Sequence, residues 1–323
     1  MKITALAGGV GGAKLANGLI GWLSPEDFCV IVNTGDDFIY SGIYICPDID
    51  TIVYTLAGIN NPVNGWGLKN ETWNVLSELE RLGHPTWFNL GDRDIATHLE
   101  RTRLLSSGYS LTDVTKKLSS YQGVKHTILP MTDSPVQTII STEELGEISF
   151  QEYFVKYRFQ PTTKKIYFKG IEAAILPEEA RSRLISSDLV IICPSNPFVS
   201  IDPILSVSDV REILSTKTII AISPLIGGKT IKGPAAKLMN ELGMTPSSLN
   251  IAKYYGNLLT GFILDHTDHE EANAISQCGI IPLVTDILIP DSETQIKLAS
   301  KVLEFGQELL KDKKPCHYGQ LFR

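Results

Sequence analysis

The chain has 323 residues, of which 43% are hydrophobic and 20% are charged, and its formal net charge is −7 at pH 7. This composition is typical of a globular protein with a sizeable core and excludes a disordered chain. The negative charge argues against broad binding to nucleic acid. Because no apolar stretch is long enough to span a bilayer and the chain opens on a strand in place of an export signal, we expect a cytoplasmic protein with no membrane partner.

The cysteines predict neither a disulfide framework nor a structural zinc site. They are scattered, odd in number and form no C-x-x-C pair: Cys29, Cys46, Cys193, Cys278 and Cys316. This usage fits a reducing compartment. We expect Cys29, Cys193 and Cys278 to be small core residues because their sequence neighbours are apolar.

Short apolar runs alternate with amphipathic stretches along most of the chain. The expected strands are Ile3–Ala7, Cys29–Asn33, Val136–Ser141, Leu189–Cys193 and Thr218–Ile222. The expected helices are Lys14–Leu23, Thr72–Leu82, Ile95–Ser106, Leu111–Ser119, Pro203–Leu214, Pro234–Leu242 and Glu293–Leu310. Continuous β-branched runs are typical of parallel strands buried on both faces. The pattern predicts a doubly wound, mostly parallel, Rossmann-like α/β sheet with helices on both faces.

Residues 1–323 are expected to form one α/β domain, because no Pro-, Gly- or Ser-rich linker divides the chain. The segment from about residue 99 to 177 differs from the rest, being helical at first and then charged and hairpin-like around 153–169. We interpret this segment as an insertion that covers the ligand cleft. The run Lys311–Lys314 is expected to be a solvated chain end.

The first expected strand leads directly into Gly8-Gly9-Val10-Gly11-Gly12-Ala13-Lys14. A strand, a glycine turn and a helix bring backbone N–H groups and a positive helix end to one point, which favours phosphate. The motif is neither a dinucleotide fingerprint nor a P-loop, since Lys14 replaces the last glycine and Ala13 separates Gly12 from the lysine. We predict phosphate contact by Gly9, Val10, Gly11, Gly12 and Lys14. Close packing of strand and helix is the alternative reason for the glycines.

Two acidic clusters follow. Asn33-Thr34-Gly35-Asp36-Asp37 comes after the second strand, where it could bind a ribose, a phosphate or a metal, or simply form an Asx-rich turn. Cys46-Pro47-Asp48-Ile49-Asp50-Thr51 precedes a helix, and capping explains only one of its acids. Two carboxylates near a phosphate loop suit Mg²⁺, or one of them could accept a proton from an attacking hydroxyl.

Three further loops offer polar side chains at fixed turns. Leu90-Gly91-Asp92-Arg93-Asp94 holds an arginine that is either salt-bridged or aimed at a phosphate or a base. Met131-Thr132-Asp133-Ser134-Pro135 precedes a strand, and Cys193-Pro194-Ser195-Asn196-Pro197 ends one. Five such loops in one α/β chain indicate a ligand site at the carboxyl ends of the strands.

Two other matches have simpler explanations. Gly228-Lys229-Thr230 resembles the end of a P-loop, but Ser223 stands where the first glycine would be. The segment Asp265–Glu271 holds two histidines that suggest a metal site. Thr267 or Asp268 as a helix cap, followed by glutamates in the first turn, explains that segment without a metal.

Six stretches, taken in order, resemble the 2-phospho-L-lactate transferases of coenzyme F420 biosynthesis. They are Gly8–Leu15, Pro47–Thr51, Leu90–His98, Leu129–Thr138, Pro194–Ser200 and Ser223–Met239. The resemblance runs from residue 1 to about residue 260 and implies a Mg²⁺-dependent, homodimeric α/β enzyme. It also implies a deazaflavin acceptor, FO, and a donor in which a three-carbon acid is joined through a diphosphate to guanosine, with GMP as the leaving product.

By position in the family motifs, Asp50 would contact the ribitol end of FO. The family has a basic residue just before the Leu90–Asp94 motif, and this chain has Asn89 there, so the acceptor contact at Asn89 stays open. In the implied reaction a terminal hydroxyl of FO attacks the phosphorus that bears the acid, and GMP departs. Such a step needs charge neutralisation and in-line positioning more than covalent catalysis.

The resemblance and the residues together give a hypothesis for the roles. The glycine turn, Lys14 and Arg93 would bind the diphosphate, while Asp48 and Asp50 would hold Mg²⁺ and the attacking hydroxyl, with Asp37 as a third metal ligand. The donor nucleotide would be bound by Asn33, Ser134, Ser195 and Asn196. We expect Asp50→Asn to remove most turnover and to leave the fold intact.

Two other functions are weighed against this one. A paralogous group of similar fold binds nucleotide-sugars as a regulator without transfer chemistry, and the acids of Pro47–Asp50 and the Leu90–Asp94 motif favour the transferase. An NAD-dependent dehydrogenase is disfavoured by Lys14 in place of the third glycine. The donor's acid, whether phospholactate, phosphoenolpyruvate or phosphoglycerate, stays open at this point.

Overall fold

The computed structural model describes residues 1–312, and within them seven parallel strands form the central sheet. The strands are β1 (Ile3–Ala7), β2 (Phe28–Val32), β5 (Thr127–Pro130), β9 (Leu189–Ile192), β10 (Thr218–Ile222), β13 (Gly261–Leu264) and β14 (Ile281–Val284). Their order is β14-β13-β10-β9-β1-β2-β5, and every neighbouring pair is parallel. The predicted doubly wound α/β sheet is confirmed.

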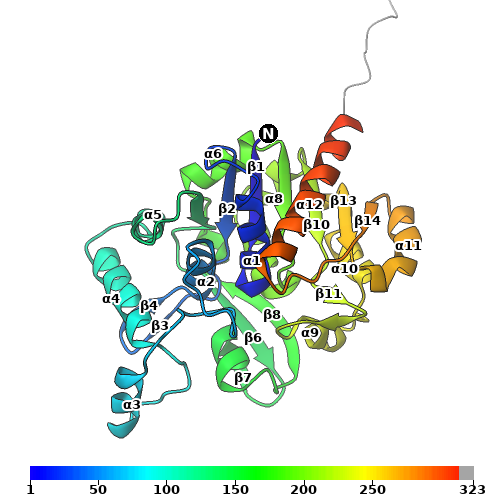
Figure 1. The fold of residues 1–323 in the computed structure, drawn as a ribbon. Helices are drawn as coiled ribbons and strands as arrows, with labels where there is room; N and C mark the ends of the chain where they lie inside the picture. Colours follow the sequence, from blue (N-terminus) through cyan, green and yellow to red (C-terminus); the bar gives the residue numbers. More distant parts are fainter. Residues whose placement is uncertain (313–323) are drawn as a thin grey trace, which may run out of the picture.

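Helices cover both faces of this sheet (Figure 1). They are α1 (Gly9–Ile20), α2 (Pro47–Leu56), α3 (Asn74–Arg81), α4 (Asp92–Ser106), α5 (Leu111–Tyr121), α6 (Glu178–Ser186), α7 (Asp202–Ser206), α8 (Val210–Leu214), α9 (Ala235–Glu241), α10 (Ser248–Tyr255), α11 (Ala272–Gln277) and α12 (Ser292–Asp312). Alternation along β1 places Ala5 in the core beneath α1, α2 and α12, and Leu6 in the core beneath α6, α8 and α10. Because both faces are covered, every residue of β1 is buried.

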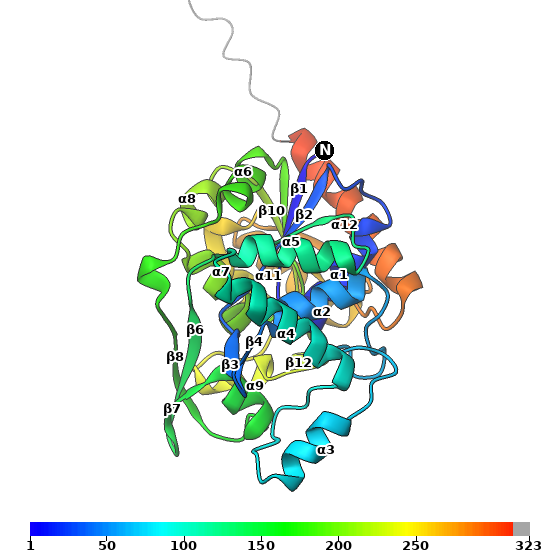
Figure 2. The same cartoon turned by 90° about the vertical axis from the view of Figure 1, so that its left-hand side faces the viewer.

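Smaller sheets stand beside the central one. β6 (Gln137–Thr142) pairs antiparallel with β7 (Gly146–Ser149) and with β8 (Thr163–Lys169). β3 (Phe38–Tyr40) pairs with β4 (Ile43–Ile45), and β11 (Leu225–Ile226) pairs with β12 (Lys229–Thr230). The expected strand Val136–Ser141 corresponds to β6. Figure 2 shows it away from the central sheet, in the antiparallel group with β7 and β8.

The segment from residue 99 to 177 combines two structural parts. It contains α5 and the edge strand β5, which belongs to the central sheet, and then the antiparallel sheet of β6, β7 and β8. The expected helix Pro203–Leu214 is also divided. It consists of α7 and α8, because Asp209 between them adopts a left-handed conformation with φ of 67°.

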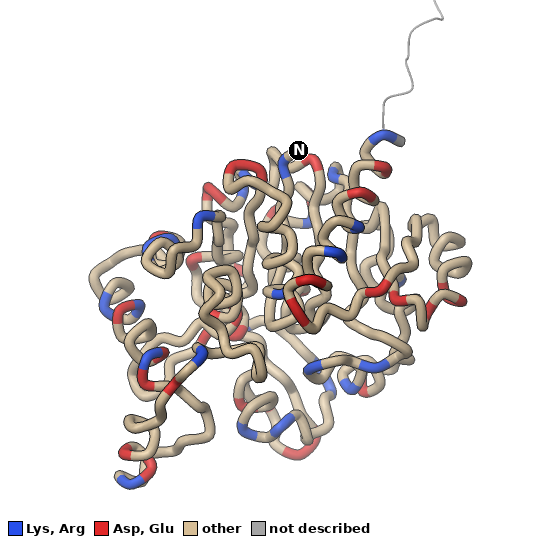
Figure 3. Tube along the Cα trace, viewed as in Figure 1, with Lys and Arg blue, Asp and Glu red and all other residues tan. Residues whose placement is uncertain are grey.

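The remaining composition-based expectations have mixed outcomes. No helix within residues 1–312 is long and apolar enough to cross a membrane. Lysine, arginine, aspartate and glutamate are interspersed along the trace (Figure 3). Cys29 and Cys193 are buried as expected, but Cys278 is exposed, because it directly follows α11 at the surface. Cys316 and most of the Lys311–Lys314 run lie outside the described residues.

The order of the strands creates a crevice at the carboxyl end of the sheet. From β1 the chain moves outward to β2 and β5, and it then returns to β9 on the other side of β1. The loops that follow β1 and β9 therefore diverge, and ligands bind at such a topological switch point. These two loops are the glycine turn and the segment Pro194–Asn196.

Candidate functional site

A cavity of about 600 Å³ opens at this switch point. A smaller cavity of about 200 Å³ adjoins it. The two share Val10, Gly11, Pro194, Asn196 and Lys232 as lining residues. The larger volume is in the range of small-molecule and cofactor sites.

The glycine turn is joined tightly to the loop after β9. The backbone N–H of Gly8 donates to Ser195 Oγ at 3.2 Å, and that hydroxyl donates to the Gly8 carbonyl at 2.7 Å. A Cβ on Gly11 would lie 2.3 Å from the Pro194 carbonyl oxygen, so only glycine fits there. Packing therefore accounts for part of the glycine pattern. Gly9, Val10 and Gly11 also line the larger cavity, at the positive end of α1.

The side chain of Asp48, at the start of α2, binds the N-terminal end of α1. Its Oδ1 accepts the Gly9 N–H at 2.8 Å, and its Oδ2 accepts the Asn33 amide at 2.9 Å. Burial raises the pKa of Asp48 to about 6, and those two hydrogen bonds partly offset the rise. Asn33, which does not line either cavity, therefore orients a carboxylate of the cavity wall.

Two further buried acids lie next to Asp48. Burial raises the pKa of Asp36 well above its usual value, and the charges of Asp48 and Asp37 add to the rise. Asp36 Oδ1 has no hydrogen-bond partner within the described chain, and Asp36 lines the larger cavity. Asp37 is also buried with a raised pKa, caused first by burial, but it lies outside the lining of both cavities. This part of the site concentrates negative charge.

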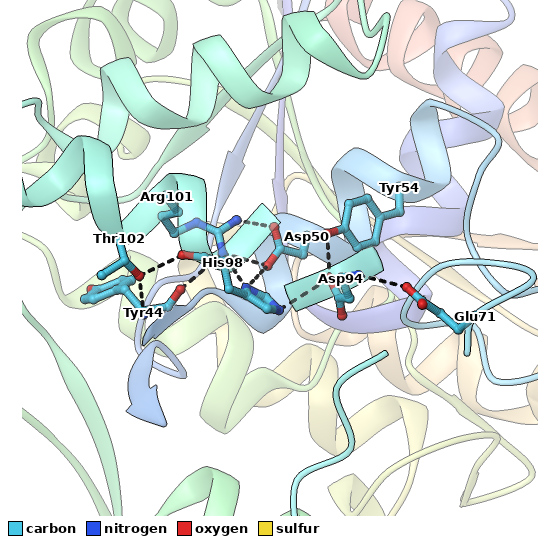
Figure 4. Close-up of polar contacts among 8 residues, drawn as sticks. All are labelled: Tyr44, Asp50, Tyr54, Glu71, Asp94, His98, Arg101 and Thr102. Atoms are coloured by element: carbon cyan, nitrogen blue, oxygen red, sulfur yellow. Dashed lines mark hydrogen bonds and ion pairs between the residues drawn. The ribbon is translucent and has the colours of Figure 1, made fainter. Parts of the chain in front are cut away.

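Asp50 has a different environment, although it lies only two residues after Asp48 on α2. The buried guanidinium of Arg101 on α4 donates to both carboxylate oxygens, and its Nη1 is 3.0 Å from Asp50 Oδ2 (Figure 4). Paired donors of this kind form the strongest hydrogen bonds to a carboxylate. The carboxylate of Asp50 is thus fixed in orientation at the cavity wall by a charged partner.

The network continues through His98, which also lines the cavity (Figure 4). Its Nδ1 lies 2.9 Å from Arg101 Nη1, and because a guanidinium only donates, Nδ1 accepts. The ring proton is then on Nε2, which lies 3.3 Å from Asp94 Oδ1. The Tyr54 hydroxyl donates to the same Asp94 oxygen at 2.6 Å. Although burial opposes it, the adjacent imidazole of His98 and the hydrogen bond from Tyr54 hold the pKa of Asp94 below its usual value.

Glu71 anchors the start of α4 and with it this network. Its carboxylate accepts the backbone N–H of Asp94 at 2.8 Å and of Arg93 at 3.0 Å. These are first-turn donors that have no partner inside the helix. The acid that caps α4 therefore comes from the loop before α3, 22 and 23 residues before the two residues whose N–H groups it binds.

Two lysines meet beside the glycine turn. Lys14 lines the smaller cavity, and Lys232 lines both cavities. Burial lowers the pKa of Lys14, and the charge of Lys232 lowers it further, while Asp291 acts in the opposite direction. Two ammonium groups near a helix N-terminus are suited to an anion with more than one charge.

Part of the lining of the larger cavity is apolar and aromatic. It includes Phe88, Phe150, Phe154, Phe159 and Trp66. Phe150 and Phe154 stack at 5.5 Å between ring centroids with an interplanar angle of 7°. Asn89 lies next to Phe88 in this lining. The cavity therefore combines polar groups around the glycine turn with aromatic side chains suited to a planar aromatic ligand.

The structure places some predicted site residues elsewhere. Arg93 donates from Nη1 to the Lys69 carbonyl at 3.1 Å, and Ser134 donates to the Ala173 carbonyl at 3.4 Å. Neither residue lines either cavity. Gly12, which was predicted to contact phosphate, does not line them either, and it packs against Ser195. In the Asp265–Glu271 segment the cap is Asp265, which accepts the Thr267 N–H at 2.9 Å. It lies two residues before Thr267 and three before Asp268, which were the expected caps.

Sequence reasoning missed Arg101, Tyr54 and Lys232. The spacing of Asp94, His98 and Arg101 places all three on one face of a helix, and this was the available signal. Tyr54 lies one helical turn after Asp50, on the same helix. Lys232 has no local signal, because it meets the site only through the tertiary fold.

The buried acids fit a divalent cation. Among residues 1–312, no three His, Cys, Asp or Glu side chains lie close enough together to enclose a metal ion by themselves. Mg²⁺, however, is usually held by one or two carboxylates, substrate phosphates and water. Asp36 has a buried oxygen with no partner, and Asp48 lies between it and the glycine turn. These two side chains suit such a shared site.

Comparison with known proteins places the chain in a family. A family model described as 2-phospho-L-lactate transferase CofD matches residues 3–299. The phosphoenolpyruvate transferase of Thermobifida fusca is 37% identical, covering 96% of this chain and 99% of its own length. The 2-phospho-L-lactate transferase of Methanosarcina mazei is also 37% identical, covering 92% of this chain and 98% of its own length.

A solved structure of a UPF0052 family member from Bacillus halodurans has a similar fold, with a TM-score of 0.59 at 13% identity. It covers 94% of this chain and 98% of that protein. At this identity the likeness concerns the fold alone. The family model and the relatives span nearly the whole chain, including the glycine turn, Asp48, Asp50 and Arg101. The chain therefore belongs to the 2-phospho-L-lactate transferase family, CofD.

Proposed function

We propose that this protein transfers a three-carbon phospho-acid from a guanosine-diphosphate-linked donor to the terminal ribitol hydroxyl of FO and releases GMP. The observation that carries the proposal is the mixed lining of the larger cavity. It brings the glycine turn, Asp36 and Asp48 together with the aromatic rings of Phe88, Phe150 and Phe154. An aromatic acceptor with a polar ribitol chain matches such a lining.

The donor diphosphate is proposed to lie where the two cavities meet. Val10 and Gly11 supply the positive end of α1, and Lys14 supplies a mobile charge. The Asn196 amide supports this placement, because its Nδ2 is buried without a partner in the described chain and the residue lines both cavities. The nucleoside then occupies the smaller cavity, whose walls include Pro224 and Ile289.

In the proposed step the FO hydroxyl oxygen forms a bond to the phosphorus that bears the acid. The bond from that phosphorus to the bridging oxygen breaks, and GMP leaves with the second phosphate, which takes up the proton that the hydroxyl loses. Asp36 and Asp48 would hold Mg²⁺, which when bound neutralises charge on the phosphates. Asp50, held by Arg101, orients the ribitol hydroxyl. The ammonium of Lys14 stabilises the departing phosphate.

The donor acid is proposed to be one of the three-carbon phospho-acids. The two relatives described above have equal identity to this chain and carry different donor names, one phosphoenolpyruvate and one 2-phospho-L-lactate. Turnover of guanosine-diphosphate-linked phospholactate, phosphoenolpyruvate and phosphoglycerate, compared side by side by kcat/KM, would identify the preferred donor.

Binding of FO to the purified protein tests the proposal. The fluorescence of FO is followed during titration, with and without GDP and Mg²⁺. We expect saturable binding that GDP strengthens, because both ligands would lie in adjoining parts of one site. Absence of FO binding, together with retained binding of GDP or a nucleotide-sugar, would contradict the transferase and favour the regulatory alternative.

A further inference from the structure

A lysine in the stretch Ser223–Met239, to which the sequence assigned no role, connects two loops above the glycine turn. Lys232 follows β12, and its Nζ donates to the Asn64 carbonyl at 3.0 Å and to the Val63 carbonyl at 3.4 Å. Residues 63 and 64 belong to the loop between α2 and α3. We call residues 60–68 the cover loop. Two segments separated by more than 160 residues are therefore tied by one ammonium group.

The cover loop is internally ordered and rests on the glycine turn. The Asn61 side chain accepts the backbone N–H groups of Val63 at 2.9 Å and Asn64 at 3.2 Å, and Asn61 N donates to the Gly67 carbonyl at 2.9 Å. At its tip Gly65 has φ of 80°, and a Cβ there would lie 2.6 Å from Val10 Cγ1. The tip thus touches Val10, one of the residues that line both cavities.

Lys232 is also placed to meet the donor itself. It lines both cavities, and its charge acts on Lys14 across the smaller one. Its two partners in the cover loop are neutral carbonyls, and within the described residues no carboxylate forms an ion pair with it. An anion at the junction of the two cavities would lie between two ammonium groups and the positive end of α1.

We propose that Lys232 is a donor-binding residue that contacts the diphosphate and, through the Val63 and Asn64 carbonyls, holds the cover loop over it. This inference rests on the proposed function, because it assumes a diphosphate at the junction of the cavities. Lys14 approaches the phosphates from α1, and Lys232 approaches from the opposite loop. The cover loop, with Trp66 in the cavity lining, then excludes water from the reacting phosphorus.

GDP titration of the full-length protein and its variants tests the role of the charge. We expect Lys232→Met to weaken GDP binding at least about 10-fold and Lys232→Arg to stay within about threefold of the wild type, because a charge-assisted contact is lost only in the first. Lys229→Met is the matched control, since Lys229 is exposed on β12 and lines neither cavity. GDP binding by Lys232→Met within about twofold of the wild type would overturn the proposal.

Accessibility of Trp66 tests the tie to the loop, which a simple phosphate contact would not affect. Acrylamide quenching is measured for each protein and for the same protein with Trp66→Phe, and the difference reports Trp66. We expect GDP to protect Trp66 in the wild type and in Lys229→Met but not in Lys232→Met. Gly65→Ala, which pushes the loop tip away from Val10, should lose the protection as well. Equal protection in Lys232→Met would overturn the loop role.

The outcomes separate this inference from the proposed function. If FO fails to bind while GDP binding still depends on Lys232, the transferase proposal fails and the role of Lys232 stands. If FO binds and is turned over while GDP binding is indifferent to Lys232, only the present inference fails. Lys232 is exposed, so its substitution is not expected to prevent folding.

Discussion

Asp48 and Asp50 lie two residues apart on the first turn of α2, line the same cavity and have the same exposed fraction of 6%, yet their surroundings differ. Asp48 is held by two neutral donors and faces other acids. Asp50 is held by the fixed positive charge of Arg101. The comparison shows that equal spacing and burial do not give equal chemistry. The neighbours make one carboxylate a candidate cation ligand and the other a fixed acceptor.

The largest expected effect is a loss of stability when the ion pair between Asp50 and Arg101 is broken. Arg101→Met leaves Asp50 as a buried charge without its partner, and we expect a loss of about 3–5 kcal/mol in the free energy of unfolding. Replacing both residues, as in Arg101→Met with Asp50→Leu, should recover most of that loss, because no unpaired charge remains. Urea unfolding of the two variants measures the difference. A single variant as stable as the wild type would show that Arg101 does not compensate Asp50.

The same pair changes the expectation for Asp50→Asn. The sequence alone predicted an intact fold, but an asparagine there would leave the buried guanidinium of Arg101 without its counter-charge. Loss of turnover in this variant must therefore be read beside its unfolding free energy.

Asp48→Asn should be the cleaner test of chemistry. An asparagine keeps one oxygen acceptor for Gly9 or Asn33 and removes the charge that the proposed Mg²⁺ needs. We expect kcat to fall at least about 100-fold, while unfolding free energy changes by about 1–2 kcal/mol. GMP release and urea unfolding are measured on the same preparation. Turnover near that of the wild type would remove Asp48 from the reaction.

A smaller effect is expected for Lys14, which is proposed to bind the diphosphate of the donor. Lys14→Met should weaken GDP binding about 10-fold at low salt, and the difference from the wild type should shrink as salt screens the charge. Arg93→Met is the control, because Arg93 lies outside both cavities and donates to the Lys69 carbonyl. Titration of GDP at two ionic strengths gives both values. An Arg93 effect equal to that of Lys14 would place the diphosphate elsewhere.

The smallest predicted effect concerns the unpartnered amide of Asn196. Its Oδ1 accepts the Phe198 N–H at 3.0 Å, and serine can also make such a cap. Asn196→Ser should therefore keep stability and weaken GDP binding about fivefold, because one donor to a phosphate is lost. Thermal unfolding and GDP titration separate the two roles. Unchanged GDP affinity would mean that Nδ2 does not face the donor.

The sequence predicts the centre of the fold better than its edges. For β1, β2, β9 and β10 the expected boundaries differ from the structure by at most one residue, because each is a buried apolar run. The strands β5, β13 and β14 were missed. Each has four residues, β5 ends at a proline, and the edge strand β14 contains Pro282. Such runs are too short to stand out by periodicity alone.

The start of α1 shows tertiary structure overriding local preference. The glycine-rich turn predicted a helix from Lys14, since glycine is a poor helix former. The helix begins at Gly9, because the turn packs against Pro194 and Ser195 and its first N–H is bound by Asp48. The proposed phosphate site is thereby a helix end and not a loop in front of one.

The candidate site was predictable where its residues follow strands and unpredictable where they meet across the fold. Asp48 and Asp50 stood out because capping needs only one acid. Arg101 resembles an ordinary surface charge in Leu99–Arg103, and only the packing of α4 against β4 and α2 reveals that it is buried. Lys232 needs the contact with residues 63 and 64, which no local pattern encodes.

Formation of GMP by the wild-type protein tests the central claim most directly. The protein is mixed with FO, Mg²⁺ and guanosine-diphosphate-linked phospholactate or phosphoenolpyruvate, and GMP and the FO product are quantified by chromatography and mass spectrometry. The account predicts equal amounts of GMP and of FO carrying the phospho-acid, with neither formed when FO is omitted. GMP that forms at the same rate without FO, or no GMP while donor and FO both bind, would contradict transfer at this cavity.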